Sequence, residues 1–315
     1  MSASGNIINY NIRTCKSVER RMILSTIAEL FKSVPYSQRR YIGFGSTYFT
    51  DFKLFHKELH IENMISFEME SSLEKRVEFN KPFRCINARI GKSSDLLQDI
   101  EWNPQIKDII WMDYDNQLDY EMFNDVEHIF SNISAGSVYI MTCNKQLKEY
   151  ETTEAFNDDF GELVPIDISI NDFSGEKDFL LIRKMFLNKI EQVLRGRNQP
   201  LQPDQQFVFH PLFFFTYRDG APMISFGGFL SILSQNFNLS QYHLGNFEFI
   251  QTGTDRYIID PPTISIKETY LLNSHLPNSE EGFTNEEQLD FIPITDRNKY
   301  RKLYKFLPSY MDVIT

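Results

Sequence analysis

Five short apolar segments in the first half of the chain alternate with segments of helical periodicity. The apolar segments are residues 40–42, 63–67, 82–86, 106–111 and 136–142. Short, continuously apolar runs are typical of strands that are buried on both faces of a parallel sheet. Helices expected at residues 17–31, 49–59 and 120–133 supply the crossovers of βαβ units. The sequence therefore predicts an α/β fold with a Rossmann-like, mostly parallel sheet.

Residues 144–175 are polar and acidic, which predicts a long loop or a small insertion. A helix is then expected over residues 176–195, because its apolar residues recur at helical spacing. Gly196 stands where a helix C-terminal cap is expected.

An antiparallel hairpin is predicted at the end of this sheet. Residues 207–215 and 223–226 are β-prone, and they flank the tight-turn dipeptide Asp219-Gly220. Prolines inside these segments should lie at bulges or edges. The hairpin is rich in aromatic residues and could also supply an interface with a second copy or another protein partner.

The remaining residues predict a small C-terminal α+β appendage. A second hairpin is expected from residues 247–250 and 256–259, a capped helix over residues 265–276, and one late helix in the charged tail. The expected domains are an N-terminal arm and helix (1–35), a Rossmann-like domain (36–230) and the appendage (231–315).

Composition excludes several classes of protein. Lys and Arg total 32 against 43 Asp and Glu, a formal net charge of −11, so bulk nucleic-acid binding is not expected. The three Cys residues are widely separated, which favours a reduced cytoplasmic protein without disulfides or a cysteine zinc site. The His residues show no metal-ligand spacing, so we expect no metal. No run reaches the roughly 18 apolar residues of a membrane span, and residues 1–11 lack the apolar core of a signal peptide.

The turn Gly43-Phe44-Gly45-Ser46 joins the first expected strand to its helix. Its glycines would let backbone N–H groups and the helix N-terminus approach a nucleotide-type cofactor. Glu68 ends the second expected strand, where an acid can accept hydrogen bonds from ribose hydroxyls. The alternatives are a tight turn without a ligand and a solvated loop acid. We expect this loop and Glu68 to bind a cofactor.

Asp113 and Asp115 end the fourth expected strand, at the edge where α/β sheets bind ligands. A carboxylate there could act as a general base on a hydroxyl or amine, hold a metal, or cap the next helix. We expect the two residues to be catalytic.

Positive charges crowd the start of the chain at Arg13, Lys16 and Arg20. Like charges this close cost free energy unless an anion or an acidic surface compensates them. One interpretation is an arm that folds over the site and holds a phosphate or carboxylate of the substrate. The other is a solvated face that pairs with the protein's own carboxylates.

The order of strands and helices, followed by a long helix and a hairpin, resembles the class I S-adenosylmethionine-dependent methyltransferases over about residues 36–230. The residues that carry the resemblance are Gly43-Phe-Gly45, Glu68, Gly91 to Ser94, and Asp113-Tyr-Asp115. Residues 13–20, 41–52 and 111–115 are also similar to a poorly characterised bacterial group labelled as O-methyltransferases.

The resemblance implies S-adenosylmethionine as cofactor and a last strand that inserts antiparallel. It also implies adenine contacts for Ser93 and Ser94, with a helix cap as the alternative. The superfamily usually has an acid two residues before the first glycine, which contacts the methionine part of the cofactor; here that position is Tyr41. Thr47 stands where a third small residue is usual.

We therefore predict a methyltransferase that acts on a small or nucleotide-like acceptor, with Asp113 as the base. The alternative, which Tyr41 slightly favours, is a non-catalytic nucleotide-binding sensor or scaffold of the same fold within a bacterial defence system. A third hypothesis keeps the cofactor and changes the reaction. No Asn/Asp-Pro-Pro-Tyr/Phe motif follows the fourth strand, which disfavours amino-methyltransferases of DNA bases or glutamine.

Overall fold

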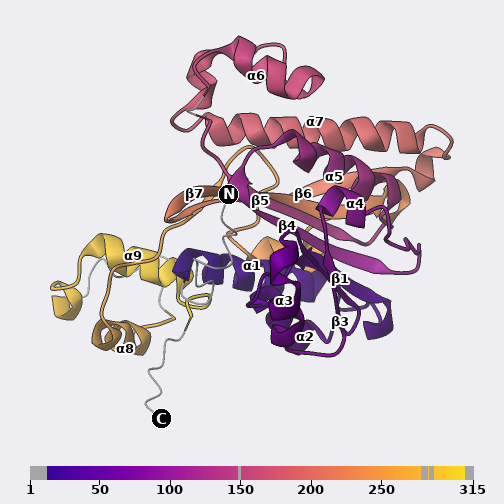
Figure 1. The fold of residues 1–315 in the computed structure, drawn as a ribbon. Coiled ribbons are helices and arrows are strands. Elements are labelled where there is room, and N and C mark those ends of the chain that lie inside the picture. The colour runs from indigo at the N-terminus through magenta and orange to yellow at the C-terminus, as the bar shows by residue number, and fades with distance from the viewer. Residues whose placement is uncertain (1–12, 148–149, 278–282, 284–286, 309–315) are drawn as a thin grey trace.

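A computed structural model describes residues 13–147, 150–277, 283 and 287–308, and it contains an eight-stranded sheet within these residues. The strand order is β3-β2-β1-β4-β5-β7-β6-β8 (Figure 1). The strands are β1 Arg39–Phe44, β2 Met64–Glu68, β3 Ile86–Ile90, β4 Lys107–Gln117, β5 Val138–Asn144, β6 Phe207–Asp219, β7 Ala221–Ile232 and β8 Tyr257–Ile259. Only β7 runs antiparallel to its neighbours, β5 and β6. The predicted mostly parallel sheet with an antiparallel hairpin is confirmed, and β8 follows that hairpin as a further parallel strand.

Helices cover both faces of the sheet (Figure 1). One layer contains α4 Ser93–Leu96, α5 Tyr120–Asn132, α6 Thr153–Phe160 and α7 Asp178–Asn198. The other contains α1 Thr14–Leu30, α2 Thr50–Leu59 and α3 Glu74–Asn80. Alternate residues of a strand point to opposite faces. Ile110 and Met112 of β4 accordingly pack in the first layer, and Ile109 and Trp111 pack in the second.

Helix α1 begins at Thr14, earlier than the Ser17 start that the sequence predicted. The backbone N–H groups of Cys15 and Lys16 donate to the carboxylate of Asp219, at 3.2 and 2.8 Å. The helix is therefore capped by the tip of the β6–β7 hairpin. This contact also holds α1 against the carboxyl edge of the sheet.

The third strand was predicted at residues 82–86, which is wrong. Strand β3 begins at Ile86 and pairs with β2, whereas the residues before it form a turn in which the Ile86 N–H donates to the Phe83 carbonyl at 3.3 Å. Pro82 lacks the N–H that a strand in this position would need. The sequence analysis also missed α3, which precedes this turn.

The predicted β6–β7 hairpin is present, and Gly220 at its turn has φ +95°. The register shifts between Pro211 and Phe213, so one proline lies at a bulge as expected. Gly196 was expected to end the long helix, but α7 continues to Asn198. The described residues of the range 144–175 contain α6 and two short 3₁₀ helices, so they form a small insertion with structure of its own.

The C-terminal residues contain α8 Ile266–Ser274 and α9 Ile294–Leu303. The predicted capping box of α8 is present, because Ser265 and Glu268 bond each other's backbone N–H groups. The second predicted hairpin is wrong: residues 247–250 form a turn, and β8 pairs in parallel with β6. The expected domain boundaries remain predictions, although β8 lies beyond residue 230 and belongs to the main sheet.

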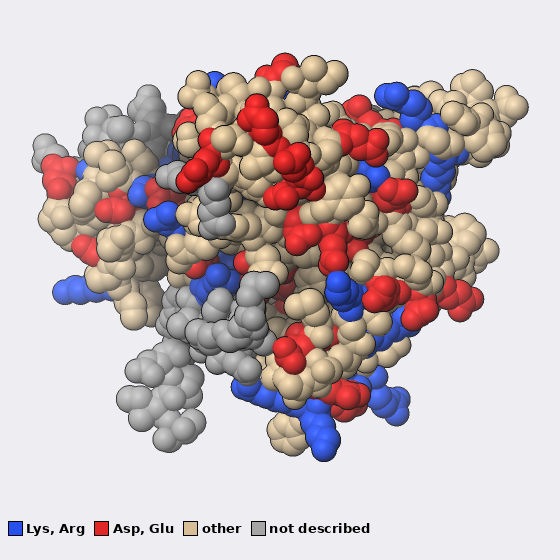
Figure 2. Space-filling model, turned by 45° about the horizontal axis from the view of Figure 1, so that its top comes forward, with Lys and Arg blue, Asp and Glu red and all other residues tan. Residues whose placement is uncertain are grey.

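Broad acidic areas cover the face shown in Figure 2, in agreement with the net charge of −11. In the part of the chain that the structure describes, no helix combines the length and apolarity that crossing a membrane requires. The same residues contain no group of three His, Cys, Asp or Glu side chains placed to hold a metal ion.

Candidate functional site

A small cleft of about 40 Å³ lies at the carboxyl edge of the sheet, between the loop after β1 and the end of β4. Ligands of α/β sheets bind at this edge. The cleft brings together five of the residues predicted for the site: Arg20, Gly45, Ser46, Asp113 and Asp115. It also contains Asp51 and Thr50, the first residues of α2.

The conformation and packing of the loop after β1 restrict which residues can occupy it. A Cβ atom added to Gly45 would overlap the Ser66 hydroxyl and lie 2.7 Å from Cε1 of Phe49. Ser46 and Phe49 adopt left-handed conformations, with φ of 46° and 50°. Non-glycine residues reach this region at a cost in free energy, and such strain is concentrated at functional sites. Gly45 is therefore required by packing, and the strained loop brings Ser46 to the cleft.

Tyr41 stands where the superfamily usually has an acid, and it is 1% exposed. Phe52 and Phe55 each pack edge-on against its ring, with ring centres 4.7 Å apart. Burial, together with the nearby charges of Asp51 and Asp113, raises the pKa of Tyr41 well above its ordinary value. Its side chain is therefore neutral and cannot supply the negative charge of the missing acid.

Asp51 supplies a negative charge in this cleft, and the sequence analysis missed it. Its carboxylate, which is 5% exposed, forms an ion pair with Nε of Arg20. Burial opposes the charge of Arg20, but Asp51 and Asp113 outweigh it and raise the pKa of the guanidinium. An acid in the first helical turn after a glycine loop was the available signal, because the helix N-terminus favours negative charge there.

Lys16, in the first turn of α1, is buried and binds two carboxylates. Its Nζ lies 2.7 Å from Oδ1 of Asp113, 2.8 Å from Oε2 of Glu19 and 4.4 Å from the centre of the Trp111 ring. Burial opposes its charge, yet Asp113 and Glu19 together raise its pKa. The hydroxyl of Tyr217 donates to Oε2 of Glu19 at 3.1 Å. Lys16 therefore fixes the position of Asp113 from inside the protein.

Burial also raises the pKa of Glu19, and Lys16 opposes that shift. Oε1 of Glu19 has no hydrogen-bond partner within the described residues. Sequence reasoning left open whether the basic residues bind a ligand or form a solvated face. Lys16 and Arg20 pair with the protein's own carboxylates, as the second interpretation expected, but at 1% and 5% exposure they are buried and not solvated.

Arg13 lies apart from the cleft. It occupies the N-cap position of α1, and its Nη2 donates to the backbone carbonyl of Asp219 at 3.4 Å. Gly43 is not a lining residue either: an added Cβ would lie 2.7 Å from the Tyr41 hydroxyl oxygen and 2.8 Å from the Trp111 carbonyl oxygen. Gly43 therefore permits close packing beside the cleft.

Glu68 is the last residue of β2 and is half-buried. Its Oε1 accepts a hydrogen bond from the backbone N–H of Glu70 at 3.3 Å. Burial raises the pKa of Glu68, and the negative charge of Asp115 contributes to the increase. Glu68 therefore lies at the carboxyl edge of the sheet, as predicted, but it does not line the cleft.

Ser93 and Ser94 begin α4, but the N-cap residue is Lys92, which makes no side-chain cap. The helix-cap interpretation of the two serines is therefore wrong. The Ser93 hydroxyl donates to Oδ2 of Asp125 at 2.6 Å, and the hydroxyl of Tyr114 donates to the same oxygen at 2.6 Å. Ser93 thus links α4 to α5 beside the end of β4.

A larger cavity of about 650 Å³ lies at the first turn of α1, where Cys15 and Tyr217 line it. Its wall carries the basic residues Lys145, Arg218 and Arg256 and the acidic residues Asp178 and Asp260. Lys145 pairs with Asp178 at 2.7 Å and Arg256 with Glu176 at 2.5 Å. Tyr217 belongs both to this wall and to the Lys16 cluster, so the cavity lies next to the residues that hold Asp113.

Solved structures with a similar fold include several methyltransferases. An S-adenosylmethionine-dependent methyltransferase from Listeria monocytogenes, described as putative, is 8% identical over 65% of this chain and 98% of its own, with a TM-score of 0.37. A spermidine synthase bound to a transition-state analogue is 10% identical over 77% and 68%, with a TM-score of 0.40. Human N-acetylserotonin methyltransferase with S-adenosylmethionine is 10% identical over 67% and 51%, with a TM-score of 0.35. No curated protein matches the sequence.

The model of a protein family described as "Putative O-methyltransferase" matches residues 8–315, nearly the whole chain. This match confirms the predicted class of enzyme and its cofactor, S-adenosylmethionine. The chain therefore belongs to this O-methyltransferase family, within the class I S-adenosylmethionine-dependent methyltransferases.

Proposed function

We propose that this enzyme methylates a hydroxyl or amine of a small anionic acceptor, with Asp113 as the group that receives the acceptor's proton. The observation that carries the proposal is the position of Asp113 at the carboxyl end of β4, in the cleft beside Gly45 and Ser46. A hydrogen bond from the buried Lys16 ammonium holds it there.

The chemistry of the cleft fits the cofactor. S-adenosylmethionine carries a sulfonium and an ammonium, a carboxylate, and a ribose with two hydroxyls. Asp51 and Asp115 offer negative charge to the cations, and Arg20 offers positive charge to the carboxylate. Glu68 would accept hydrogen bonds from the ribose. In this arrangement Asp51 contacts the methionine part of the cofactor. The superfamily usually makes this contact with an acid at the position of Tyr41.

The cleft is too narrow for the methionine part of the cofactor while Arg20 is paired with Asp51. Its volume of about 40 Å³ is well below that of an ordinary ligand pocket, which is roughly 300–1,000 Å³. We infer that Arg20 leaves Asp51 when the cofactor enters and turns to the cofactor carboxylate. The exchange replaces one ion pair by another, so it does not leave a buried charge unpaired.

Bound S-adenosylmethionine supplies an activated methyl group, so the protein's work is to align the acceptor and exclude water. Lys16 keeps the Asp113 carboxylate in one place, and Asp113 accepts the proton of the attacking hydroxyl or amine. Helix α1, held at its N-terminus by Asp219, covers this edge of the sheet and limits access of water.

The cavity beside α1 supports an anionic acceptor. It holds about 650 Å³ and adjoins the Lys16 cluster through Tyr217. Lys145 and Arg256 each have an acidic partner, but the Arg218 side chain is exposed and forms no ion pair within the described residues. A carboxylate or phosphate on the acceptor would pair with Arg218 and orient the acceptor toward Asp113.

Isothermal titration calorimetry with S-adenosylmethionine and S-adenosylhomocysteine tests the cofactor site. We expect micromolar binding that Glu68→Ala abolishes and Glu70→Ala preserves, because the Glu70 carboxylate already caps a 3₁₀ helix by accepting from the Ser72 N–H. If neither ligand gave a heat of binding, the assignment of this cleft as the cofactor site would be refuted. Mass spectrometry of a small-molecule extract incubated with methyl-labelled cofactor then identifies the acceptor. Binding without any labelled product would instead support a non-catalytic sensor.

A further inference from the structure

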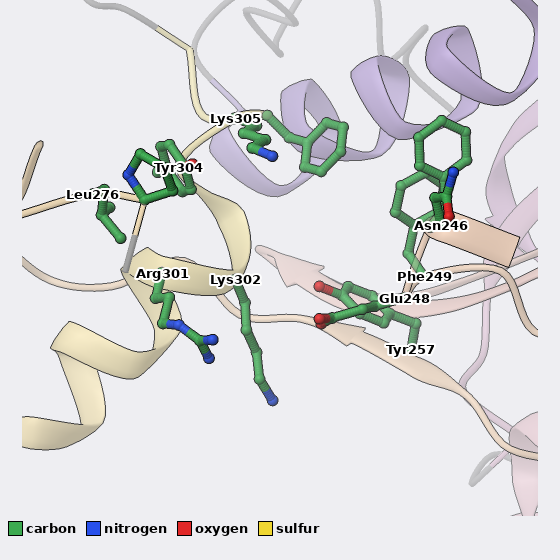
Figure 3. Close-up of a pocket in the computed structure, with 12 residues that line it drawn as sticks. Asn246, Glu248, Phe249, Tyr257, Leu276, Arg301, Lys302, Tyr304 and Lys305 are labelled. Atoms are coloured by element: carbon green, nitrogen blue, oxygen red, sulfur yellow. The ribbon is translucent and has the colours of Figure 1, made fainter. Parts of the chain in front are cut away.

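A second pocket, of about 390 Å³, lies between α9 and the edge of the sheet near β8. In Figure 3, Arg301 and Lys302 of α9 stand on one side, and Glu248, Phe249 and Tyr257 stand on the other. None of its lining residues lines the cleft at Asp113. Its volume falls in the range of ordinary small-molecule sites. The pocket is therefore large enough for a ligand of its own.

Three basic residues, from α9 and the turn after it, line this pocket. Lys302 and Lys305 are exposed, and Arg301 is half-buried and has a partner of its own. Glu248 is the one acid among the lining residues. If the charge of Arg301 is left out because it has a partner, the two lysines and Glu248 still give the lining a net charge of +1. Basic residues suit the C-terminal turn of a helix, but the helix dipole does not explain why they face a cavity.

Aromatic rings supply flat surfaces in the same pocket. Phe247 and Phe249 stack with their centres 5.0 Å apart, and Phe306 meets Phe249 edge-on at 5.3 Å. Tyr304 and Tyr257 also line the space. Burial, with a smaller effect of Glu248, raises the pKa of Tyr257 to about 12. The Tyr257 hydroxyl therefore stays protonated at neutral pH and can donate a hydrogen bond.

We propose that this pocket binds a small aromatic phosphate monoester of the nucleotide type. The ring lies against the aromatic side chains, the phosphate pairs with Lys302 and Lys305, and Glu248 accepts hydrogen bonds from sugar hydroxyls. A phosphate monoester suits the site because it carries a charge of about −1.5 to −2 at neutral pH and three acceptor oxygens. The proposal goes beyond methyl transfer, because the site shares no residue with the cofactor cleft.

Calorimetry with AMP, GMP, CMP and UMP, and with adenosine and inorganic phosphate, tests the site. We expect at least one nucleotide to bind more tightly than adenosine and than phosphate. The double variant Lys302→Gln/Lys305→Gln should weaken that binding by about tenfold or more, because it removes two charged contacts. Lys267→Gln, at an exposed position on α8, is the matched control and should bind like the wild type.

The titrations would overturn the proposal if they gave any of three results: no binding of any nucleotide at millimolar concentration, undiminished binding in a double variant that keeps the wild-type circular dichroism spectrum, or phosphate binding as tight as that of the nucleotides. Displacement of the nucleotide by S-adenosylmethionine would also overturn it, because the ligand would then occupy the cofactor cleft. Glu68→Ala should still bind the nucleotide. Nucleotide binding in this variant would separate failure of the present proposal from failure of the proposed cofactor site.

Discussion

Replacing Lys16 with Met should destabilise the protein strongly, because it leaves the buried Glu19 and the half-buried Asp113 without their shared cation. Lys16 donates to both carboxylates at 2.7 and 2.8 Å and lies 4.4 Å from the centre of the Trp111 ring. Breaking a buried ion pair by removing one partner costs roughly 3–5 kcal/mol. At about 2 °C per kcal/mol for a chain of this size, the melting temperature should fall by about 6–10 °C.

The loss should also depend on pH. Burial raises the pKa of Glu19 in the folded protein above its value in the unfolded chain. Protonated Glu19 therefore favours the folded state. This contribution to the free energy of unfolding is lost as the pH rises through the folded pKa. Lys16 opposes the shift in the wild type, and Lys16→Met removes that opposition. The variant should therefore be destabilised less at pH 5 than at pH 8, in urea denaturation at both pH values.

Two comparisons make this prediction refutable. Lys32→Met removes a lysine that is 71% exposed and pairs with Glu29 at 3.6 Å, and it should change stability by less than about 0.5 kcal/mol. Adding Glu19→Gln to Lys16→Met removes one unpaired charge and should recover part of the loss. A loss as small as that of Lys32→Met, an equal loss at both pH values, or additive effects in the double variant would contradict the ion-pair argument.

Other predictions concern the cap of α1 and two glycines. Asp219→Ala should destabilise the protein by about 0.5–2 kcal/mol in urea denaturation, because it removes the side chain that caps α1. Gly45→Ala should lower the melting temperature and abolish cofactor binding in calorimetry, because its Cβ would overlap Ser66 and Phe49. Gly196→Ala should instead stabilise by up to about 1 kcal/mol, since Gly196 lies inside a helix with no atom within 4 Å of its added Cβ. An unchanged melting temperature in either glycine variant would contradict these assignments.

Much of the site could be predicted because the carboxyl ends of neighbouring parallel strands meet at one edge of the sheet. The ends of buried apolar runs can be found from the nearby sequence alone. This pattern was enough to identify Gly45, Glu68 and Asp113, which follow or end such runs. The structure places Asp113 inside a longer strand than expected, since β4 continues to Gln117, but the residue stays at the same edge.

The environment of the basic residues could not be predicted, because it depends on distant contacts. Asp219 caps α1 although it is 204 residues away from Cys15 in the sequence. Lys16 looked like part of an exposed charged arm, but the hairpin that caps α1 also brings it over Trp111 and Asp113. Neither periodicity nor charge spacing carries that information. The error at β3 had a different cause, because Pro82 was read as part of an apolar run although it cannot donate to a strand ladder.

Asp51 offers the sharpest test of the proposal that this cleft binds the cofactor without an acid at position 41. If Asp51 binds the ammonium of the methionine part, Asp51→Asn should weaken S-adenosylmethionine by about tenfold, the value of one charged hydrogen bond. The variant should bind 5′-methylthioadenosine like the wild type, because that ligand lacks the amino acid group. Glu68→Gln should weaken both ligands, because both have the ribose. Equal losses for the two ligands in Asp51→Asn would mean that Asp51 acts only by supporting α2 and Arg20, and the cofactor's ammonium would then need another partner.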